Sequence, residues 1–327
     1  MISPRDTLPG ELRKMSVAEL GKLSELIGAA FAEEQGRQGR NFRAELQRFG
    51  RFLPLFRLLV ALRPSLEELF YTLVLDTGDR FVAAVTVVRQ GNDRSRWNIA
   101  NVVTHPDFRG RGLARVLVET ALVHVRERGG RFVLLDVRPD AEPAYRLYRR
   151  LGFLLLRVST TVKGDARPAM APGCPPEYSL RLLSAADWRT RLAVHRRLAS
   201  PAALAICPPT PEQFQSSRLA RLALSLTRRA RQILLQSWAV ETAAEPIGLL
   251  NCQSSRSGPH YAWVGVAPDH PAAVPCAIGQ AIRSCGALRP GPVILELAGE
   301  SQPGIELLGS LGFHSIETMH RLGTRLE

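Results

Sequence analysis

Apolar residues recur at helical spacing near the start of the chain. From Val17 to Glu34, the residues Leu20, Leu23, Ile27 and Phe31 fall on one stripe, which predicts a helix with one buried face. A second helical stretch, 42–62, is more apolar. Pro54 should kink or break it, because proline removes a backbone donor and clashes with the preceding turn.

The pattern then changes to short runs rich in β-branched and aromatic residues. Runs 70–75 and 81–89 flank a turn that contains Gly78, and a third run covers 97–104. Such runs, separated by a glycine-containing turn, predict strands. Their order predicts an antiparallel meander.

A strand, helix, strand unit follows the meander. Helical spacing from Leu113 to Val125 predicts a helix that ends at Gly129-Gly130, and 132–137 is a short, almost uniformly apolar strand. This unit implies a parallel, right-handed crossover. A helix from about 142 to 151 and a β run over 154–162 complete a mixed, mainly antiparallel sheet flanked by helices, of the α/β (α+β) class.

The second half repeats the order of the first. Residues 164–176 are rich in Pro, Gly and Ala without apolar periodicity, which predicts a linker between domains 1–163 and 177–327. Beyond the linker, strands are predicted at 180–183, 232–241, 247–253 and 261–266, and helices at 185–198 and about 211–227.

Two short matches at nearly one offset support duplication. Leu151-Gly152-Phe153 recurs as Leu311-Gly312-Phe313, an offset of 312 − 152 = 160, and Pro106-Asp107 recurs as Pro268-Asp269, an offset of 162. Each pair ends the same type of element, so the sequence predicts a tandem repeat.

Charge changes the picture little. The net charge of +13 arises mostly from arginine, since the chain has three lysines. Short pairs such as Arg149-Arg150 favour a solvated helix face over a phosphate track, which disfavours nucleic-acid binding. A net-positive surface attracts an anionic ligand.

The five cysteines are odd in number and form no Cys-x-x-Cys pair. They predict reduced, mostly structural thiols and no metal site. No apolar stretch approaches the roughly 20 residues of a membrane span. The charged start of the chain does not resemble a secretory signal, so a cytoplasmic location is expected.

The segment from Val102 to Ala114 carries the most chemistry. It reads as strand, turn and helix start within thirteen residues, with Gly110 and Gly112 in the turn. Glycines let the backbone approach a ligand closely, and the N–H groups of a helix start favour a pyrophosphate. The dinucleotide fingerprint and the phosphate-binding Walker motif both need other spacings, so neither is present.

The whole string resembles motif A of the GNAT acetyltransferase superfamily, in which Arg/Gln-x-x-Gly-x-Gly/Ala cradles the coenzyme A pyrophosphate, here Arg109, Gly112 and Ala114. The segment 144–153, ending in Leu-Gly-Phe, is similar to the family's motif B. The resemblance implies two GNAT-type domains, acetyl-CoA as cofactor and splayed strands at its cleft. The implied cofactor-binding residues are Val102, Val103, Thr104, Arg109, Gly110, Arg111, Gly112, Leu113, Ala114, Ala144 and Tyr148.

The resemblance also implies catalytic roles. A backbone N–H near Val103 would polarise the thioester carbonyl, and Tyr148 would protonate the departing thiolate. The alternative for Tyr148 is a core aromatic residue on an amphipathic helix. Ala141 stands where the family often has asparagine, which puts one side-chain hydrogen bond near the cofactor in doubt.

The acceptor amine must lose a proton before it attacks, so a base or a water chain is needed. The candidates are Asp136 on the predicted strand 132–137 and Glu33 or Glu34 at the end of the first helix. Asp136 could instead be a solvated strand-end residue. His105 and His124 are interpreted as turn and helix-surface residues.

The second half lacks the cradle, because prolines and no glycine pair follow Pro268-Asp269, and Leu308 stands at the position of Tyr148. We therefore expect an active first domain and a degenerate second one that shapes the acceptor pocket or supports a homo-oligomer. The expected reaction is direct transfer of acetyl from acetyl-CoA to a small-molecule or peptide amine. The alternatives are a non-catalytic acyl-CoA-binding or regulatory module and, third, an arginine-mediated nucleic-acid binder.

Overall fold

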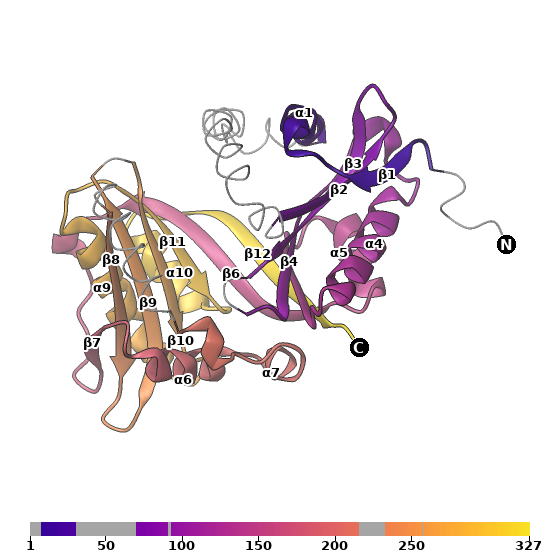
Figure 1. The fold of residues 1–327 in the computed structure, drawn as a ribbon. Helices are drawn as coiled ribbons and strands as arrows, with labels where there is room; N and C mark the ends of the chain where they lie inside the picture. The colour runs from indigo at the N-terminus through magenta and orange to yellow at the C-terminus, as the bar shows by residue number, and fades with distance from the viewer. Residues whose placement is uncertain (1–7, 31–69, 91–92, 216–232, 257) are drawn as a thin grey trace. The chain divides into compact units, whose positions relative to one another are not determined.

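The computed structural model describes residues 8–30, 70–90, 93–215, 233–256 and 258–327. By its internal contacts the chain divides into two compact units (Figure 1), residues 1–135 with 324–327, and residues 136–323. The helix predicted at 42–62 and the candidate bases Glu33 and Glu34 lie outside the described residues. So does most of the helix predicted at 211–227.

The strands of the first unit form the predicted meander and crossover. Neighbouring strands β1 to β4 pair antiparallel, and β4 pairs parallel with β5. The helix between β4 and β5 supplies the predicted crossover. The bounds are β1 Glu11–Lys14, β2 Phe70–Asp76, β3 Phe81–Arg89, β4 Arg96–Thr104 and β5 Phe132–Val137.

Two helices cover this sheet. The 3-10 turn Val17–Glu19 begins at a capping box, in which Ser16 and Glu19 exchange side-chain and backbone hydrogen bonds, and leads into α1, Leu20–Ala30. Helix α1 buries its apolar stripe against β2, β3 and β4, and α4, Leu113–Glu127, contacts β2, β3 and β4 as well. Since β3 is buried without interruption from Phe81 to Val87, the sheet is covered on both faces.

The Gly129-Gly130 pair ends α4 as predicted, for two reasons. Gly129 has φ +73°, which an L-residue with a side chain rarely adopts. A Cβ on Gly130 would collide with the side chains of Val125 and Trp97. The first glycine is thus needed for its conformation and the second for its small size.

The second unit is built on a larger sheet. Its strands lie in the order β12, β6, β11, β10, β9, β8, β7. The strand β6 precedes the predicted linker in sequence, yet it pairs with β11 and β12 from the end of the chain. The bounds are β6 Leu154–Asp165, β7 Ser179–Leu183, β8 Ile233–Glu241, β9 Pro246–Ser255, β10 His260–Val266, β11 Pro292–Ala298 and β12 His314–Arg325.

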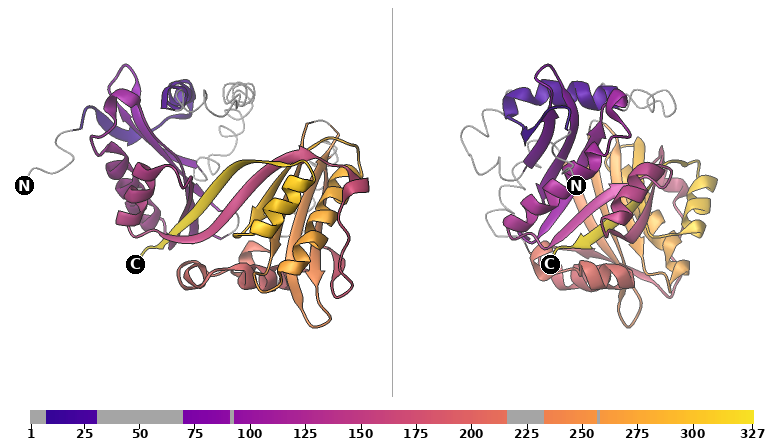
Figure 2. Two further views of the ribbon diagram at one scale, coloured as in Figure 1. Left: turned by 180° about the vertical axis from the view of Figure 1, so that it is seen from behind. Right: turned by 90° about the vertical axis from the view of Figure 1, so that its right-hand side faces the viewer.

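Helices cover both faces of this sheet as well (Figure 2). Helix α9, Val274–Gly286, packs over β9 and β10, where Leu250 and Val264 join its core. Helix α6, Trp188–Leu198, contacts the other face through Leu249, since successive strand residues point to opposite faces. The remaining helices are α5 Glu142–Arg150, α7 Pro201–Ile206 and α10 Gln302–Ser310.

The two Leu-Gly-Phe segments end their helices in the same way. Phe153 N donates to Tyr148 O at 3.0 Å after α5, and Phe313 N donates to Leu308 O at 2.9 Å after α10. The intervening glycines have φ +83° and +84°. This matched helix end is what the 160-residue offset in the sequence predicts.

The expectation of reduced thiols is wrong for one pair. Cys174, in the predicted linker, and Cys276, in α9, form a disulfide with Cα atoms 4.1 Å apart. The linker residues run back over α9, where Gly279 lies tight against Pro172 O. The pairing brings together positions 102 residues apart, and sequence spacing alone carries no sign of it. Cys207, Cys252 and Cys285 are buried and form no disulfide with any cysteine that the structure describes.

Candidate active site

A bulge distorts β4 in the part of the strand where the sequence resemblance predicts the pantetheine arm. The β3–β4 register shifts between the pairs Ala84↔Val103 and Thr86↔Ala100, and Asn101 adopts φ +50°. An extra residue in one strand bends it and interrupts the ladder. The residues Val102, Val103 and Thr104 follow the bulge, with Val103 buried against α1.

The same strand separates from its parallel neighbour. The β4–β5 ladder runs from Arg96↔Phe132 to Ile99↔Leu135, and β4 continues from Ala100 to Thr104. In the second half, the corresponding β10–β11 ladder runs two pairs further, to Gly265↔Ala298. The opening that the resemblance implies between two parallel strands is therefore present in the first half and closed in the second.

The glycine turn connects this strand to α4. Pro106–Phe108 forms a single 3-10 turn, and Gly110 and Gly112 then adopt φ +77° and +75°. A Cβ at either glycine would meet nothing within 4 Å, so the glycines are required for their left-handed conformation and leave open space above the turn. Gly112 is the N-cap of α4, and because it has no side chain it cannot cap the first N–H groups of the helix.

These features suit a phosphate-bearing ligand. The first N–H groups of a helix have no intrahelical partner, and the helix dipole adds positive potential at that end. Here Leu113 and Ala114 begin α4 below the open space over Gly112. The cradle thus offers backbone donors and room for a pyrophosphate, with residues that fit the group.

The two arginines of the turn do different things. Arg109 donates from Nη2 to Ala30 O at 2.7 Å, which ties the turn to the end of α1. Arg111 is exposed, lies over the Phe108 ring at 4.9 Å and donates to Asp107 O at 3.1 Å. Arg109 therefore has a structural contact that the sequence did not predict, and Arg111 keeps its charge at the surface.

Tyr148 and Ala144 belong to α5 in the second unit. The Tyr148 side chain is buried, with 6% of the residue exposed, and its ring packs against Phe153 at 5.8 Å. Burial raises the pKa of Tyr148 to about 12, so the phenol keeps its proton throughout the neutral range. Ala144 is half-buried. Ala141, the N-cap of α5, makes no side-chain cap hydrogen bond, as expected for the residue that replaces asparagine.

Asp136 has a partner that sequence reasoning missed. Both of its carboxylate oxygens accept hydrogen bonds from Arg321 on β12, at 2.9 and 2.7 Å. Arg321 lies directly opposite Arg157 in the β6–β12 pair, and Arg157 approaches Glu296 at 3.5 Å. The hydrogen bonds that Arg321 donates to Asp136 raise the pKa of Arg321, whereas burial lowers the pKa of Arg157. Asp136 and Arg321 are 185 residues apart, so sequence offers no signal for this pair.

The two histidines of the first half differ from each other. His105 caps the 3-10 turn, as its interpretation as a turn residue predicts. The interpretation of His124 as a helix-surface residue is wrong, because only 7% of it is exposed and its ring stacks on Tyr71 with centroids 3.3 Å apart. Burial lowers the pKa of His124 to about 4, so it is neutral at physiological pH.

Comparison with known proteins agrees with this geometry. Residues 40–153 match the Acetyltransferase (GNAT) family, and this segment contains β2 to β5, the glycine turn, α4 and α5. The chain is 52% identical to mycothiol acetyltransferase of Thermobifida fusca over 50 residues, which cover 15% of this chain and 16% of that protein. It is 31% identical to streptothricin acetyltransferase of Streptomyces lavendulae over 110 residues, which cover 32% of this chain and 58% of that protein.

These matched segments are shorter than two thirds of either relative. A solved structure, a GCN5-related N-acetyltransferase from Sphaerobacter thermophilus, matches 98% of this chain and 97% of its own with a TM-score of 0.57 and 17% identity. That likeness shows that the fold extends over the whole chain. None of the described helices is long and apolar enough to cross a membrane.

Proposed function

We propose that this chain is an acetyl-CoA-dependent N-acetyltransferase that transfers acetyl directly to a primary amine. The observation that carries the proposal is the left-handed Gly110 and Gly112 turn at the start of α4, which follows the bulged end of β4. The GNAT match over residues 40–153 supports the same assignment. The acceptor is a small-molecule or peptide amine, which is the class that this family uses.

Different described residues have different roles in the proposed reaction. The N–H groups at Gly112, Leu113 and Ala114 would hold the pyrophosphate, and the backbone of Val102 and Val103 would lie along the pantetheine arm. Acetyl-CoA, when bound, supplies the acetyl thioester. One N–H after the bulge would stabilise charge on the thioester oxygen as the amine attacks. The Tyr148 hydroxyl would give its proton to the leaving sulfur.

Free-thiol release from acetyl-CoA tests the proposed activity. With a panel of primary amines that includes an amino sugar, a polyamine and a peptide N-terminus, we expect at least one acceptor to release thiol in a saturable, enzyme-dependent manner. Mass spectrometry should find the acceptor heavier by one acetyl group. Binding of acetyl-CoA without thiol release by any amine would contradict the proposal and favour the alternative below.

We propose Asp136 as the base that removes the proton from the amine. Arg321 donates one hydrogen bond to each carboxylate oxygen, which leaves one lone pair on each oxygen for a proton. The substitution Asp136→Asn should lower kcat about a hundredfold, which is within the usual range for general base catalysis.

The matched control is Asp140→Asn, which removes an exposed carboxylate that pairs with Arg138 at 3.1 Å. This variant should keep kcat. A kcat that survives in the Asp136→Asn protein would show that another group or a water chain takes the proton. The effect of Asp136 would then be that of an ion pair only.

A second candidate function is a non-catalytic acyl-CoA-binding or regulatory module. It is favoured by the double hydrogen bond from Arg321 to Asp136, which competes with proton uptake. This candidate predicts coenzyme A binding through the same glycine turn without product formation. The amine panel distinguishes the two functions.

We propose further that the repeat boundaries lie at 1–163 and 177–327 with the linker between them, although β6 extends to Asp165. The strand β6 groups with the second unit by contacts because it pairs with β11 and β12. A cytoplasmic location, where acetyl-CoA is available, and a homo-oligomeric state complete the proposal.

A further inference from the structure

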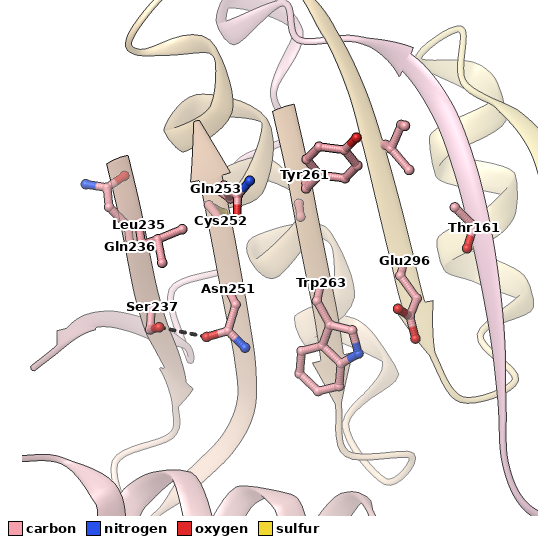
Figure 3. A pocket seen from close by; sticks show the side chains of 12 residues that line it. Thr161, Leu235, Gln236, Ser237, Asn251, Cys252, Gln253, Tyr261, Trp263 and Glu296 are labelled. Atoms are coloured by element: carbon pink, nitrogen blue, oxygen red, sulfur yellow. Dashed lines mark hydrogen bonds between the residues drawn. The ribbon is translucent and has the colours of Figure 1, made fainter. Parts of the chain in front are cut away.

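A pocket of about 480 Å³ opens on the sheet of the second unit. It is walled by two transverse rows of side chains, which the strand register brings level (Figure 3). The lower row consists of Ser237, Asn251, Trp263, Glu296 and Thr161, and the upper row of Leu235, Gln253, Tyr261 and Ile294. Five strands, β8, β9, β10, β11 and β6, contribute to it. The volume lies in the range of small-molecule sites.

The lower row offers both a hydrogen-bond donor and a hydrogen-bond acceptor. Ser237 Oγ donates to Asn251 Oδ1 at 2.7 Å, which fixes the amide and leaves its NH₂ group as a donor toward the pocket. The Glu296 carboxylate is about one third exposed, at 35%, and lies 3.5 Å from Arg157. Glu296 is thus a strong acceptor in the same row as the amide donor of Asn251, one strand beyond Trp263.

Two aromatic rings lie beside these polar groups. Trp263 stands between Asn251 and Glu296 on adjacent strands, and His195 stacks on it at 5.6 Å with planes 20° apart. Burial lowers the pKa of His195 to about 4, so the ring behind Trp263 is neutral. Tyr261, in the upper row, is 45% exposed and presents its ring to the opening.

The charges near the pocket balance. Glu296 contacts Arg157 at 3.5 Å, Arg157 lies opposite Arg321, and Arg321 is paired with Asp136. The four groups sum to zero, and none of the described lysines, arginines or histidines lines the pocket. An anionic ligand would therefore enter without a counter-charge, and Glu296, the carboxylate that a cation would seek, already faces Arg157. The pocket thus suits an uncharged ligand.

From this combination we infer that the second unit binds a small, uncharged saccharide. An aromatic ring beside amide, hydroxyl and carboxylate groups matches a molecule with an apolar ring face and a rim of hydroxyls. The flat face lies on Trp263 or Tyr261, while the hydroxyls meet Asn251 and Glu296. The inference stands independently of the acetyltransferase proposal, because it rests on the second unit alone.

Ligand-observed NMR and calorimetry on the full chain test this inference with glucose, maltose and N-acetylglucosamine. We expect at least one of them to bind with a Kd on the order of 1 mM, which is usual for a small, polar ligand. Sorbitol has hydroxyls but no ring face and should bind more weakly. Trp263→Ala and Asn251→Leu should each raise Kd at least about tenfold.

The control variant is Glu306→Gln, an exposed carboxylate of α10 outside the pocket, and it should keep the saccharide affinity. All variants should keep their affinity for coenzyme A, and Asn251→Leu and Glu306→Gln should also keep their thermal midpoint, whereas Trp263→Ala should lower it because the ring packs against the core beneath α6. The absence of saturable binding by any of the three saccharides would overturn the inference. So would binding that Trp263→Ala leaves unchanged, or binding of a cationic amine such as phenethylamine in their place.

Discussion

Gly112→Val is expected to lower the affinity for coenzyme A at least about a thousandfold, or ~4 kcal/mol. Gly112 has φ +75° at the N-cap of α4, and an L-residue there costs about 1–2 kcal/mol. The relaxed turn would also turn away donors whose hydrogen bonds to a charged phosphate contribute about 1.5–3 kcal/mol each. The side chain would occupy the open space above the turn as well. Calorimetric titration with coenzyme A measures the loss.

Gly78→Val supplies the matched control. Gly78, in the turn between β2 and β3, has φ +93° and also meets nothing within 4 Å. Its replacement introduces comparable backbone strain in the same unit without touching the proposed cradle. It should lower the thermal midpoint about as much as Gly112→Val and leave the affinity for coenzyme A intact. Equal affinities in the two variants would remove the cofactor assignment.

Tyr148→Phe should lower kcat by about 10² to 10³, which is the usual contribution of a positioned proton donor. The affinity for coenzyme A should hold, because phenylalanine preserves the packing against Phe153. The pKa of Tyr148 is about 12, so a basic limb of the pH–rate profile below about pH 11 must arise from another group. Steady-state thiol release with the best acceptor measures the effect.

A phenol with this pKa is a weaker acid than free tyrosine. Proton transfer to a leaving thiolate is therefore favourable only if the thiolate's pKa is raised too, and apolar surroundings shift thiols in that direction. Tyr145→Phe, on the same helix α5, is the control and should leave kcat within about twofold. A kcat that survives in Tyr148→Phe would mean that Tyr148 is a core aromatic residue.

The sequence predicts those parts of the fold that depend on local rules. Strand β3 and strand β5 have the bounds that their apolar runs predict, and α5 ends one residue before its predicted bound. The glycine turn was predictable because positive φ and a helix start are encoded by neighbouring residues. The repeat was predictable because Leu-Gly-Phe ends two helices alike.

The rest depends on residues distant in sequence. The disulfide between Cys174 and Cys276 and the pairing of Asp136 with Arg321 arise only when the sheet of the second unit assembles. His124 falls on the buried stripe of α4 with Leu117 and Ala121, so helical periodicity does indicate its burial. Only its stacking on Tyr71 of β2 depends on a residue distant in sequence. The short helix α7 was not predicted because its six apolar residues are too few to show a helical period.

The position of β6 limits where this chain can be divided into two separate halves. Strand β6 precedes the linker in sequence, and it lies between β12 and β11, which both follow the linker. A chain that is cut at residues 164–176 would lose β6 from the second half, so β11 and β12 would each expose unpaired backbone groups that can pair with other chains. Neither half can therefore be removed at this linker without exposing strand edges in the half that remains.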